Sequence, residues 1–569
     1  MIQNLENALN SALETLQLEL PENFHAQVDA AADLRFGDYQ ANTAMVLAKR
    51  LKMNPRQLAT QIIETIDLGG LAEADIAGPG FINFRITKTA WCQKLADLLG
   101  DDRLGVPLTE KSQTIVLDFS APNVAKPMHV GHIRSTIIGE SLARIATFVG
   151  HKVIKDNHIG DWGTQFGMII HGWKTVLDED ALNNDPVAEL LRIYRTVNGL
   201  CGQDEQVRDV CKQELVKLQG GDQENLEIWK KCVELSKDGL QGIYDQLDVS
   251  FDYWYGESYY NDRLAPLVDD MLEKGVARES DGAICVFFDE DEKLADKPTI
   301  IRKADGGFLY ATTDLATIDF RVEEWNADQI WYVVGAPQQL HFQQIFAATR
   351  KRGQNPEMQH ISFGSILGED RKLMKTRSGD NVQLVDVLTE AVERANKVIQ
   401  EKNPDMDVSE REKTAEIVGI GAVKFAELSQ HRMTDYVFSW DRMLALQGDT
   451  APYLQYSYVR VSSIFRKLDG DAELDIANLN ITEDGEVNLA RMIVRFGEVV
   501  PSLLDDFRPN LLANYLLELA KAFHSFFEAC PVLKSEGSTQ NTRLVLCELT
   551  SRVLVKGLGL LGIEAPERM

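Results

Sequence analysis

Two histidines three residues apart, His129 and His132, stand between an apolar run and a helical pattern. The N–H groups at the start of a helix have no intrahelical partner and carry a partial positive charge, so this position suits phosphate. Imidazole N–H groups can donate to phosphate oxygens, Lys126 adds a full positive charge, and Gly131 lets a nucleotide approach the backbone closely. The alternative is that the histidines only cap the helix or pack at its start. The strand before them and the helix after them favour a nucleotide site.

A second group of cations lies in the segment Lys372-Leu373-Met374-Lys375-Thr376. Lys372 and Lys375 are three residues apart, and residues 377–379 suit a flexible loop. Such a loop could bring both ammonium groups onto a departing pyrophosphate, where negative charge builds up. Lysine-rich loops are more often solvated surface, and this alternative stays open.

The histidine segment lies inside a β-loop-α-β pattern. An apolar β-branched run from Thr114 to Leu117 predicts a strand, an amphipathic helix follows the loop, and a second strand is expected around Val153. The apolar face of the helix carries Ile138, Leu142, Ile145 and Val149. Runs at Ile330–Val334 and Ile361–Phe363 predict more strands of the same parallel sheet. Ligands of such sheets bind at the carboxyl ends of the strands, which is where the histidine loop lies.

The rest of the chain divides into parts of different character. A connector near residues 100–110 contains Gly, Asp and Pro and separates a first α+β domain, residues 1–110, from a Rossmann-like α/β domain at 111–390. Within the latter, residues of about 174–300 are charged and helix-rich, and we interpret them as an insertion. From about residue 410 strand patterns nearly vanish, so residues 391–569 are expected to form an all-α domain.

Length and composition exclude several classes of protein. The chain of 569 residues is too long for one hydrophobic core, and it contains no apolar run long enough to cross a bilayer. The N-terminus does not have the pattern of a secretory signal, so a cytoplasmic location is expected. Seven widely spaced cysteines argue against a zinc knuckle or a disulfide framework and predict reduced, mostly buried thiols. The formal net charge of -28 argues against nucleic-acid binding unless the acidic excess lies away from an RNA-facing side.

The stretch Asp118 to His132, DFSAPNVAKPMHVGH, resembles the nucleotide site of arginyl-tRNA synthetases. His-Val-Gly-His is similar to the His-Ile-Gly-His signature of class I aminoacyl-tRNA synthetases, and PNVAKPM resembles the arginyl branch. The segment around Lys372 resembles the Lys-Met-Ser-Lys-Ser loop of the class, with Met374 at the third position where the class has Ser. The family assigns a compensating role to the lysine that matches Lys126. Residues 157–167, NHIGDWGTQFG, also resemble the family and are expected to line the same cleft.

The resemblance implies an arginine pocket made by Asp118, Asn123, Tyr310, Asp314 and Gln338. A guanidinium offers five N–H donors and no acceptor, so its pocket needs carboxylates and neutral acceptors. A ligand without this cationic group would leave two buried carboxylates unpaired, which would disfavour it strongly. The alternatives are that Asp314 is the N-cap of the next helix and that Tyr310 is a half-buried strand aromatic.

The resemblance also implies contacts with RNA. Residues 447–460, QGDTAPYLQYSYVR, resemble the anticodon-binding domain of the family, in which Tyr453, Tyr456 and Arg460 match contact positions. Aromatic side chains on one helix face can stack on unpaired bases, although a core-facing tyrosine pair is the alternative. The ending GIEAPERM is similar to the family's, which implies that Met569 lies beside the anticodon loop, and residues 1–110 resemble the family domain that touches the tRNA elbow.

These resemblances imply an arginine-tRNA ligase that works in two steps. The arginine carboxylate attacks the α-phosphorus of ATP and releases pyrophosphate, and the terminal ribose hydroxyl of tRNA(Arg) then takes arginine from the adenylate. Mg²⁺ is expected to arrive with ATP, with no metal held by the protein, and the enzyme is expected to be a monomer. Three alternatives remain: another class I synthetase, a nucleotidyltransferase acting on a small metabolite, and a non-catalytic RNA-binding relative.

Overall fold

The computed structural model describes residues 1–368, 370–372, 374, 382–468 and 474–569. These residues form two compact units, each built from separate stretches of the chain. The first unit contains Met1–Pro107, Ser457–Ser502 and Tyr515–Lys556, and the second contains Leu108–Tyr456, Leu503–Asn514 and Gly557–Met569.

The second unit is built on a parallel sheet with the strand order β11-β10-β5-β6. Its strands are β5 (Thr114–Phe119), β6 (Lys152–Asp156), β10 (Gln329–Val333) and β11 (Glu357–His360). The helices that connect and cover it include α5 (Val130–Val149), α12 (Tyr310–Trp325) and α13 (Gln339–Lys351). In the register of the sheet, Asp118 of β5 lies beside both Tyr332 of β10 and Asp156 of β6. The α/β expectation is therefore confirmed, and the carboxyl ends of these strands bring polar side chains together.

One predicted strand lies slightly earlier in the chain than expected. The strand expected at Ile361–Phe363 is β11, which ends at His360. Ile361 still donates its N–H to the carbonyl of Tyr332, at 2.8 Å, but Gly364 already donates to Arg432 outside the sheet. The chain leaves the sheet at this point because its backbone groups find partners elsewhere.

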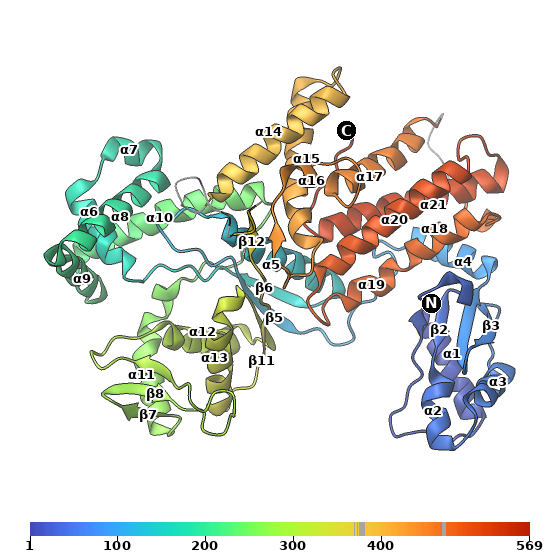
Figure 1. The fold of residues 1–569 in the computed structure, drawn as a ribbon, viewed down its shortest axis with the longest axis horizontal. Coiled ribbons are helices and arrows are strands. Elements are labelled where there is room, and N and C mark those ends of the chain that lie inside the picture. Colours follow the sequence, from blue (N-terminus) through green and yellow to red (C-terminus); the bar gives the residue numbers. More distant parts are fainter. Residues whose placement is uncertain (369, 373, 375–381, 469–473) are drawn as a thin grey trace. The chain divides into compact units, whose positions relative to one another are not determined.

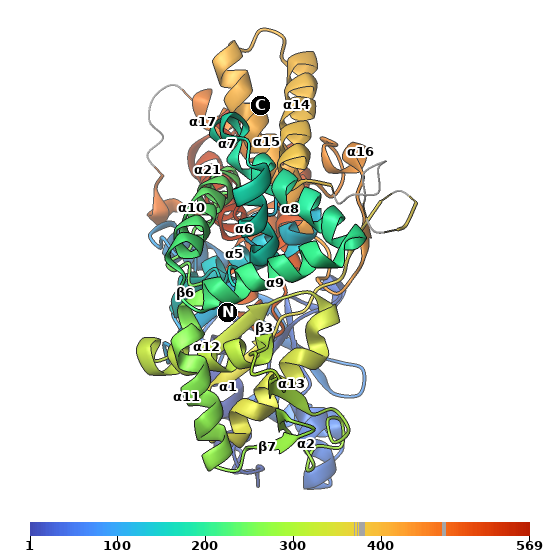
Figure 2. The same cartoon turned by 90° about the vertical axis from the view of Figure 1, so that its left-hand side faces the viewer.

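The chain between β6 and β10 forms two helix-containing groups, which Figure 1 shows as separate lobes beside the sheet. The first group contains α6 (Gln165–Val176), α7 (Glu179–Asn184), α8 (Pro186–Gln203), α9 (Glu205–Gln219) and α10 (Gln223–Gln246). The second contains α11 (Asn261–Glu273) and the antiparallel strands β7 (Ala277–Ser280), β8 (Ala283–Val286) and β9 (Thr299–Arg302). Figure 2 looks onto the first group, whose helices pack around an apolar cluster that includes Val124, Phe166 and Leu190. Val124 belongs to the loop after β5, so this helical group also supports the segment that leads to the two histidines.

Helices dominate the later part of the second unit. It contains α14 (Leu384–Lys402), α15 (Val408–Leu428), α16 (Trp440–Met443) and the start of α17 (Ala451–Arg466). Figures 1 and 2 both show α14 and α15 side by side. The short strands β12 (Ile366–Leu367) and β13 (Tyr436–Val437) pair in parallel.

The first unit combines an antiparallel sheet with helices from both ends of the chain. The sheet, of order β1-β2-β4-β3, contains β1 (Asp29–Ala30), β2 (Tyr39–Ala41), β3 (Ala72–Ala77) and β4 (Phe81–Ile86). The helices are α1 (Ile2–Thr15), α2 (Thr43–Leu51), α3 (Pro55–Thr65), α4 (Lys88–Leu99), α18 (Asp484–Val494), α19 (Phe496–Ser502), and most of α20 (Pro509–Ala529) and α21 (Gly537–Leu560). Asp38 ties the two ends together, because it pairs with Arg491 at 2.6 Å and also accepts the N–H of Ile86.

The cysteines agree with the expected thiols. All seven are free, and all but the partly exposed Cys92 are buried. In the part of the chain that the structure describes, no helix is long and apolar enough to span a membrane.

Candidate active site

The two histidines lie at the start of α5 and cap it. His129 is the N-cap residue, and its Nδ1 accepts the N–H of Gly131 at 3.1 Å. Nδ1 of His132 accepts the N–H of His129, also at 3.1 Å. A ring nitrogen that accepts a backbone N–H carries no proton, so in each neutral imidazole the proton is on Nε2. The capping interpretation is therefore correct, but it leaves each ring with an Nε2–H that can donate to a ligand.

Both imidazoles are neutral near pH 7. Burial, together with the neighbouring His129 ring, lowers the pKa of His132 to about 4. Burial and then the charge of Lys126 lower the pKa of His129. A phosphate at this position would be held by uncharged N–H donors and by the helix start rather than by imidazolium ions.

Gly131 has a structural reason besides the predicted approach of a nucleotide. A Cβ at this position would lie 2.8 Å from Cε1 and 2.9 Å from Nδ1 of His129. The His129 ring could not fold back over the helix start beside a side chain. The absence of a Cβ therefore fixes the orientation of the first imidazole.

The loop that leads from β5 to the histidines is strained and held by a buried polar network. Ser120 and Ala121 have φ of 69° and 44°, in the left-handed region that costs energy for residues other than glycine. The N–H of Ser120 donates to Oγ of Ser135 at 2.8 Å, and that hydroxyl donates to the carbonyl of Val333 at 2.6 Å. The hydroxyl of Ser120 lies 2.7 Å from that of Tyr244 on α10. Strands, α5 and the inserted helices together hold this loop in place.

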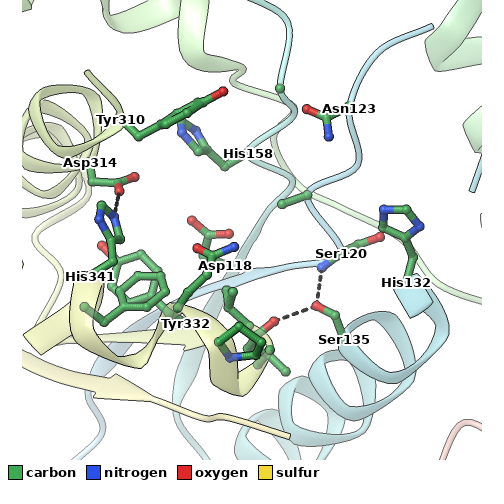
Figure 3. A pocket seen from close by; sticks show the side chains of 18 of the residues that line it. Asp118, Ser120, Asn123, His132, Ser135, His158, Tyr310, Asp314, Tyr332 and His341 are labelled. Carbon is green, nitrogen blue, oxygen red and sulfur yellow. Dashed lines mark hydrogen bonds and ion pairs between the residues drawn. The ribbon is translucent and has the colours of Figure 1, made fainter. Parts of the chain in front are cut away.

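A cavity of about 680 Å³ opens beside the histidines, at the carboxyl ends of the strands. We call it the site cavity. Eight of the predicted site residues line it: Asp118, Asn123, His129, Gly131, His132, Tyr310, Asp314 and Gln338. In Figure 3, Asn123 and His132 lie on one side, whereas Tyr310 and Asp314 of α12 lie on the other. The cavity thus has a histidine end (His129, Gly131 and His132) and an aspartate end (Asp118, Tyr310, Asp314 and His341).

Asp118 at the aspartate end is already paired with a cation of the protein. Its Oδ2 accepts from Arg321 at 2.6 Å, and the same guanidinium nitrogen donates to Asp156 at 2.8 Å. Burial alone would lower the pKa of Arg321, yet the charges of Asp118 and Asp156 hold that pKa well above its ordinary value. The expectation that a ligand without a guanidinium would leave Asp118 unpaired is wrong, because α12 supplies the buried Arg321.

Asp314 also has an internal partner. His341, in the first turn of α13, makes a short hydrogen bond to Asp314 through Nε2. Burial opposes a charge on this ring, but the hydrogen bond and the charge of Asp314 raise the pKa of His341. Both alternatives weighed for this helix are wrong: α12 begins at Tyr310 with Leu309 as its N-cap, so Asp314 lies inside the helix and Tyr310 is not in a strand.

Asn123 lies against the segment 157–167 that was expected to line the same cleft. Val124 donates its N–H to the carbonyl of Gly160 at 3.1 Å, and Gly160 donates to Pro122 at the same distance. A Cβ on Gly160 would fall 2.4 Å from Oδ1 of Asn123. His158 and Gly160 both line the site cavity, as expected for this segment.

Models of three protein families match the chain. "tRNA synthetases class I (R), catalytic domain" matches residues 94–440, "DALR anticodon binding domain" matches 454–569, and "Arginyl tRNA synthetase N terminal domain" matches 3–86. The chain belongs to the arginyl-tRNA synthetase family.

Relatives of similar length support this membership. The chain is 44% identical to the "Arginine--tRNA ligase" of Hahella chejuensis over 100% of this chain and 99% of the relative. It is 47% identical to that of Thermobifida fusca over 94% of both chains. The crystal structure of arginyl-tRNA synthetase from Plasmodium falciparum superposes with a TM-score of 0.84 at 28% identity, covering 100% of this chain and 99% of that one. The Thermus thermophilus arginyl-tRNA synthetase has the same fold, with a TM-score of 0.85 at 23% identity over 100% of both chains.

The lysines expected from the arginyl-tRNA synthetase resemblance lie apart from the site cavity or outside the described residues. Lys126 does not line the site cavity, and its ammonium lies 4.9 Å from the centre of the Tyr194 ring. Lys372 is exposed on a turn in which its carbonyl accepts the N–H of Gly368 at 2.8 Å. Lys375 lies outside the described residues.

The backbone nevertheless joins the two predicted nucleotide segments of this synthetase. Val130 donates its N–H to the carbonyl of Val382 at 2.9 Å, and Leu384 donates to the carbonyl of Met128 at 2.9 Å. The residues that follow the lysine segment are therefore held against the start of α5, beside the histidines.

The residues expected to contact RNA occupy different surroundings on α17 and near the C-terminus. Tyr456 is 43% exposed, whereas Tyr453 is half-buried. Arg460 bonds to His524 at 3.0 Å, and its guanidinium lies 4.5 Å from the centre of the Phe527 ring. Met569 packs against an apolar cluster of α14 and α15. Among the four, Tyr456 has the exposure that base stacking needs.

The sequence analysis missed several residues of the site. Arg321, Glu257, Tyr332 and His341 line the cavity or hold the residues that do. Glu257 lies within the charged insertion, where acidic residues are frequent and no spacing distinguishes it. Burial raises its pKa to about 7, against the effect of His158 and with that of Asp161 and Asp314. His341 had a detectable signal, because it lies three residues after Gln338, which was already assigned to the pocket.

Proposed function

We propose that this chain is an arginine-tRNA ligase, which forms arginyl-adenylate from ATP and L-arginine and then transfers arginine to the 3′-terminal ribose of tRNA(Arg). The observation that carries the proposal is the site cavity with its two unlike ends. The histidine end offers N–H donors to phosphate, and the aspartate end offers carboxylate oxygens to a cationic side chain. Membership of the arginyl-tRNA synthetase family agrees with this assignment.

At the histidine end, we assign the binding of the ATP phosphates to Nε2–H of His129 and His132 and to the partial positive charge at the start of α5. These donors are preorganised, because each imidazole is fixed through its Nδ1 to the backbone. Preorganised donors stabilise charge that develops on the pyrophosphate without first having to reorient. Lys126, Lys372 and Lys375 remain candidates for added positive charge from outside the cavity.

At the aspartate end, we assign Asp314 and Asp118 to binding the guanidinium of the arginine substrate. We assign Tyr310 to a contact with the side of that guanidinium. Asn123 and Gln338 are assigned to the amino and carboxylate groups of arginine, which lets the carboxylate face the α-phosphorus. No covalent intermediate with the protein is required, so the protein contributes alignment of the two substrates. Mg²⁺ enters as part of the ATP substrate, where it neutralises phosphate charge.

For the RNA, Tyr456 is assigned to stacking with an anticodon base, with Tyr453, Arg460 and Met569 nearby in the family pattern. We further propose that the chain is divided into three domains at residues 110 and 390. The protein is proposed to be a monomer located in the cytoplasm. The three family models, which match 3–86, 94–440 and 454–569, support a three-part division.

Exchange of labelled pyrophosphate into ATP tests the proposal. The full chain is assayed with each of the twenty amino acids, with and without total tRNA. Among the twenty amino acids, only arginine is expected to support exchange, and it should do so only when tRNA is present. Exchange with a different amino acid would indicate another class I synthetase, and exchange that needs neither would indicate a nucleotidyltransferase. A chain that binds tRNA but shows no exchange would be a non-catalytic relative.

Tyr456→Ala tests the RNA assignment separately. Loss of one stacking ring costs about 1–3 kcal/mol, so the KM for tRNA is expected to rise about 5- to 100-fold. The KM values for ATP and arginine should not change, because Tyr456 does not line the site cavity. Tyr456→Phe keeps the ring and should keep the affinity. If Tyr456→Ala changed the KM for ATP and not the KM for tRNA, the assignment would be contradicted.

A further inference from the structure

A second cavity of about 470 Å³ borders the segment that leads into α5. Its wall is mostly apolar and comes from this segment and from helices α8 and α10. The apolar wall residues include Met128, Val187, Leu191, Leu240 and Ile243. The volume falls within the range of about 300–1,000 Å³ that small-molecule sites occupy. We call it the α8–α10 cavity.

The charges around the α8–α10 cavity are opposite to the overall charge of the chain. Among the residues that the structure describes, Lys126, Arg192 and Arg195 line it together with a single carboxylate, Asp185. The whole chain, by contrast, has 59 basic and 87 acidic residues. Asp185 is engaged as the N-cap of α8, where it accepts the N–H of Ala188 at 3.0 Å, and Arg192 pairs with Glu189 at 2.6 Å. The ammonium of Lys126, which lies 4.9 Å from the centre of the Tyr194 ring, therefore brings positive charge to an apolar cavity.

The α8–α10 cavity is lined by Lys126, Pro127 and Met128, which directly precede the histidine end of the proposed ATP site. Lys126 lines this cavity and not the site cavity, although the family resemblance assigns it to the nucleotide. Ser236 of the wall accepts the N–H of Ala125 at 3.1 Å and so holds the residue before Lys126. Gln383 of the wall forms an antiparallel bridge with His129. A ligand in the α8–α10 cavity would touch two supports of the histidine segment, Ser236 and Gln383.

We propose that the α8–α10 cavity is a second ligand site, for a small molecule with an apolar body and one anionic group. The apolar body would contact the faces of α8 and α10, and the anion would pair with Lys126. Because Lys126 cannot serve two anions, occupation of the cavity lowers the affinity for ATP, and ATP lowers the affinity for the second ligand by the same factor. This coupling rests on the proposed function, whereas the site itself does not.

Two fluorescent probes of matched shape test the site on the full chain. 8-Anilinonaphthalene-1-sulfonate has an apolar body and one anion, and N-phenyl-1-naphthylamine has a similar body without charge. The sulfonate is expected to bind the wild type saturably, at least about tenfold more tightly than the amine. Equal affinities for the two probes would overturn the anionic assignment.

Substitutions on one helix locate the probe. Ala188→Trp on α8 places a large ring into the α8–α10 cavity and should weaken sulfonate binding at least about tenfold. Leu200→Trp is the control, since Leu200 is exposed on the same helix and does not line the cavity. Lys126→Met should weaken the sulfonate but not the amine. Unchanged sulfonate affinity in Ala188→Trp, with both variants folded by circular dichroism, would overturn the site.

Titration of the sulfonate with and without MgATP tests the coupling. MgATP is expected to raise the Kd of the sulfonate severalfold, and the sulfonate to raise the KM for ATP in pyrophosphate exchange. If arginine-dependent exchange is present and MgATP has no effect on the sulfonate, the coupling is overturned while the function stands. If arginine-dependent exchange is absent and Ala188→Trp still abolishes binding of the sulfonate, the proposed function is overturned and the ligand site in the α8–α10 cavity stands. Displacement of the sulfonate by tRNA that carries no amino acid would assign the cavity to RNA and overturn the small-molecule assignment.

Discussion

At the histidine end of the site cavity the imidazoles that face a ligand are uncharged, whereas at the aspartate end the carboxylates are held by basic side chains of the protein. His129 and His132 are neutral and fixed by backbone N–H groups. Asp118 is fixed by Arg321, and Asp314 by His341. In both ends the internal partner sets the orientation and the protonation before a substrate arrives. The comparison teaches that the histidine end would bind an anion through the geometry of its N–H donors. The aspartate end would bind a cation through carboxylates whose cost of burial is already offset by their partners in the protein.

The largest expected effect comes from removing the cation that holds the aspartate end. Arg321→Met leaves Asp118 and Asp156 buried beside each other without a counter-charge, which should cost about 3–5 kcal/mol of unfolding free energy. Urea unfolding at pH 7 measures it. Arg263→Met is the control, because its ion pairs with Glu323 and Glu324 are exposed and should contribute less than about 1 kcal/mol. Equal losses in the two variants would remove Arg321 from its proposed role.

At the histidine end the corresponding change should affect chemistry more than stability. His132→Ala removes a preorganised donor, so the kcat of pyrophosphate exchange is expected to fall about 10²- to 10³-fold. The affinity for tRNA, measured by filter binding, should stay near that of the wild type. His171→Ala, on α6 and outside the site cavity, is the control. If tRNA binding fell as much as exchange, His132 would be a structural residue only.

A smaller effect, confined to one substrate, is expected at Asp314. Asp314→Asn removes a charged acceptor worth about 1.5–3 kcal/mol, so the KM for arginine should rise about 10- to 150-fold while the KM for ATP changes little. Steady-state exchange with each substrate varied measures both. Glu323→Gln changes a carboxyl of the same helix that does not line the cavity and should leave both values unaltered. A rise in the KM for ATP alone would contradict the division of the cavity into two ends.

The smallest expected effect is a pH dependence at the aspartate end. The pKa of Glu257 is raised to about 7, so this carboxyl is mostly protonated at pH 6 and ionised at pH 8. A bound guanidinium favours the ionised form, so binding releases a proton and the affinity for arginine rises as the pH rises through 7. The KM for arginine should therefore fall severalfold from pH 6 to pH 8, and Glu257→Gln should flatten the profile. A wild-type KM that rises over this range would show that the sign is wrong.

The sequence predicts those parts of the site that depend on local patterns. The β-loop-α-β order placed His129 and His132 at a helix start, and the parallel sheet placed Asp118 at its carboxyl edge. It could not predict the partner of Asp118, because Arg321 lies 203 residues away in the chain and meets it only through the sheet. The start of α12 was also missed, since Leu309 caps it without a polar side chain. Long-range pairing and unusual caps carry no local signal.

The neutrality of the histidine end is the claim on which the account depends most, and the pH profile of kcat/KM for ATP tests it directly. Pyrophosphate exchange is measured from pH 6 to pH 9 with saturating arginine, tRNA and excess Mg²⁺. Because the pKa of His132 is lowered to about 4, the account predicts a level profile over this range. A value that falls about tenfold for each pH unit above 6.5 would mean that an imidazolium binds the phosphates, and it would contradict the account.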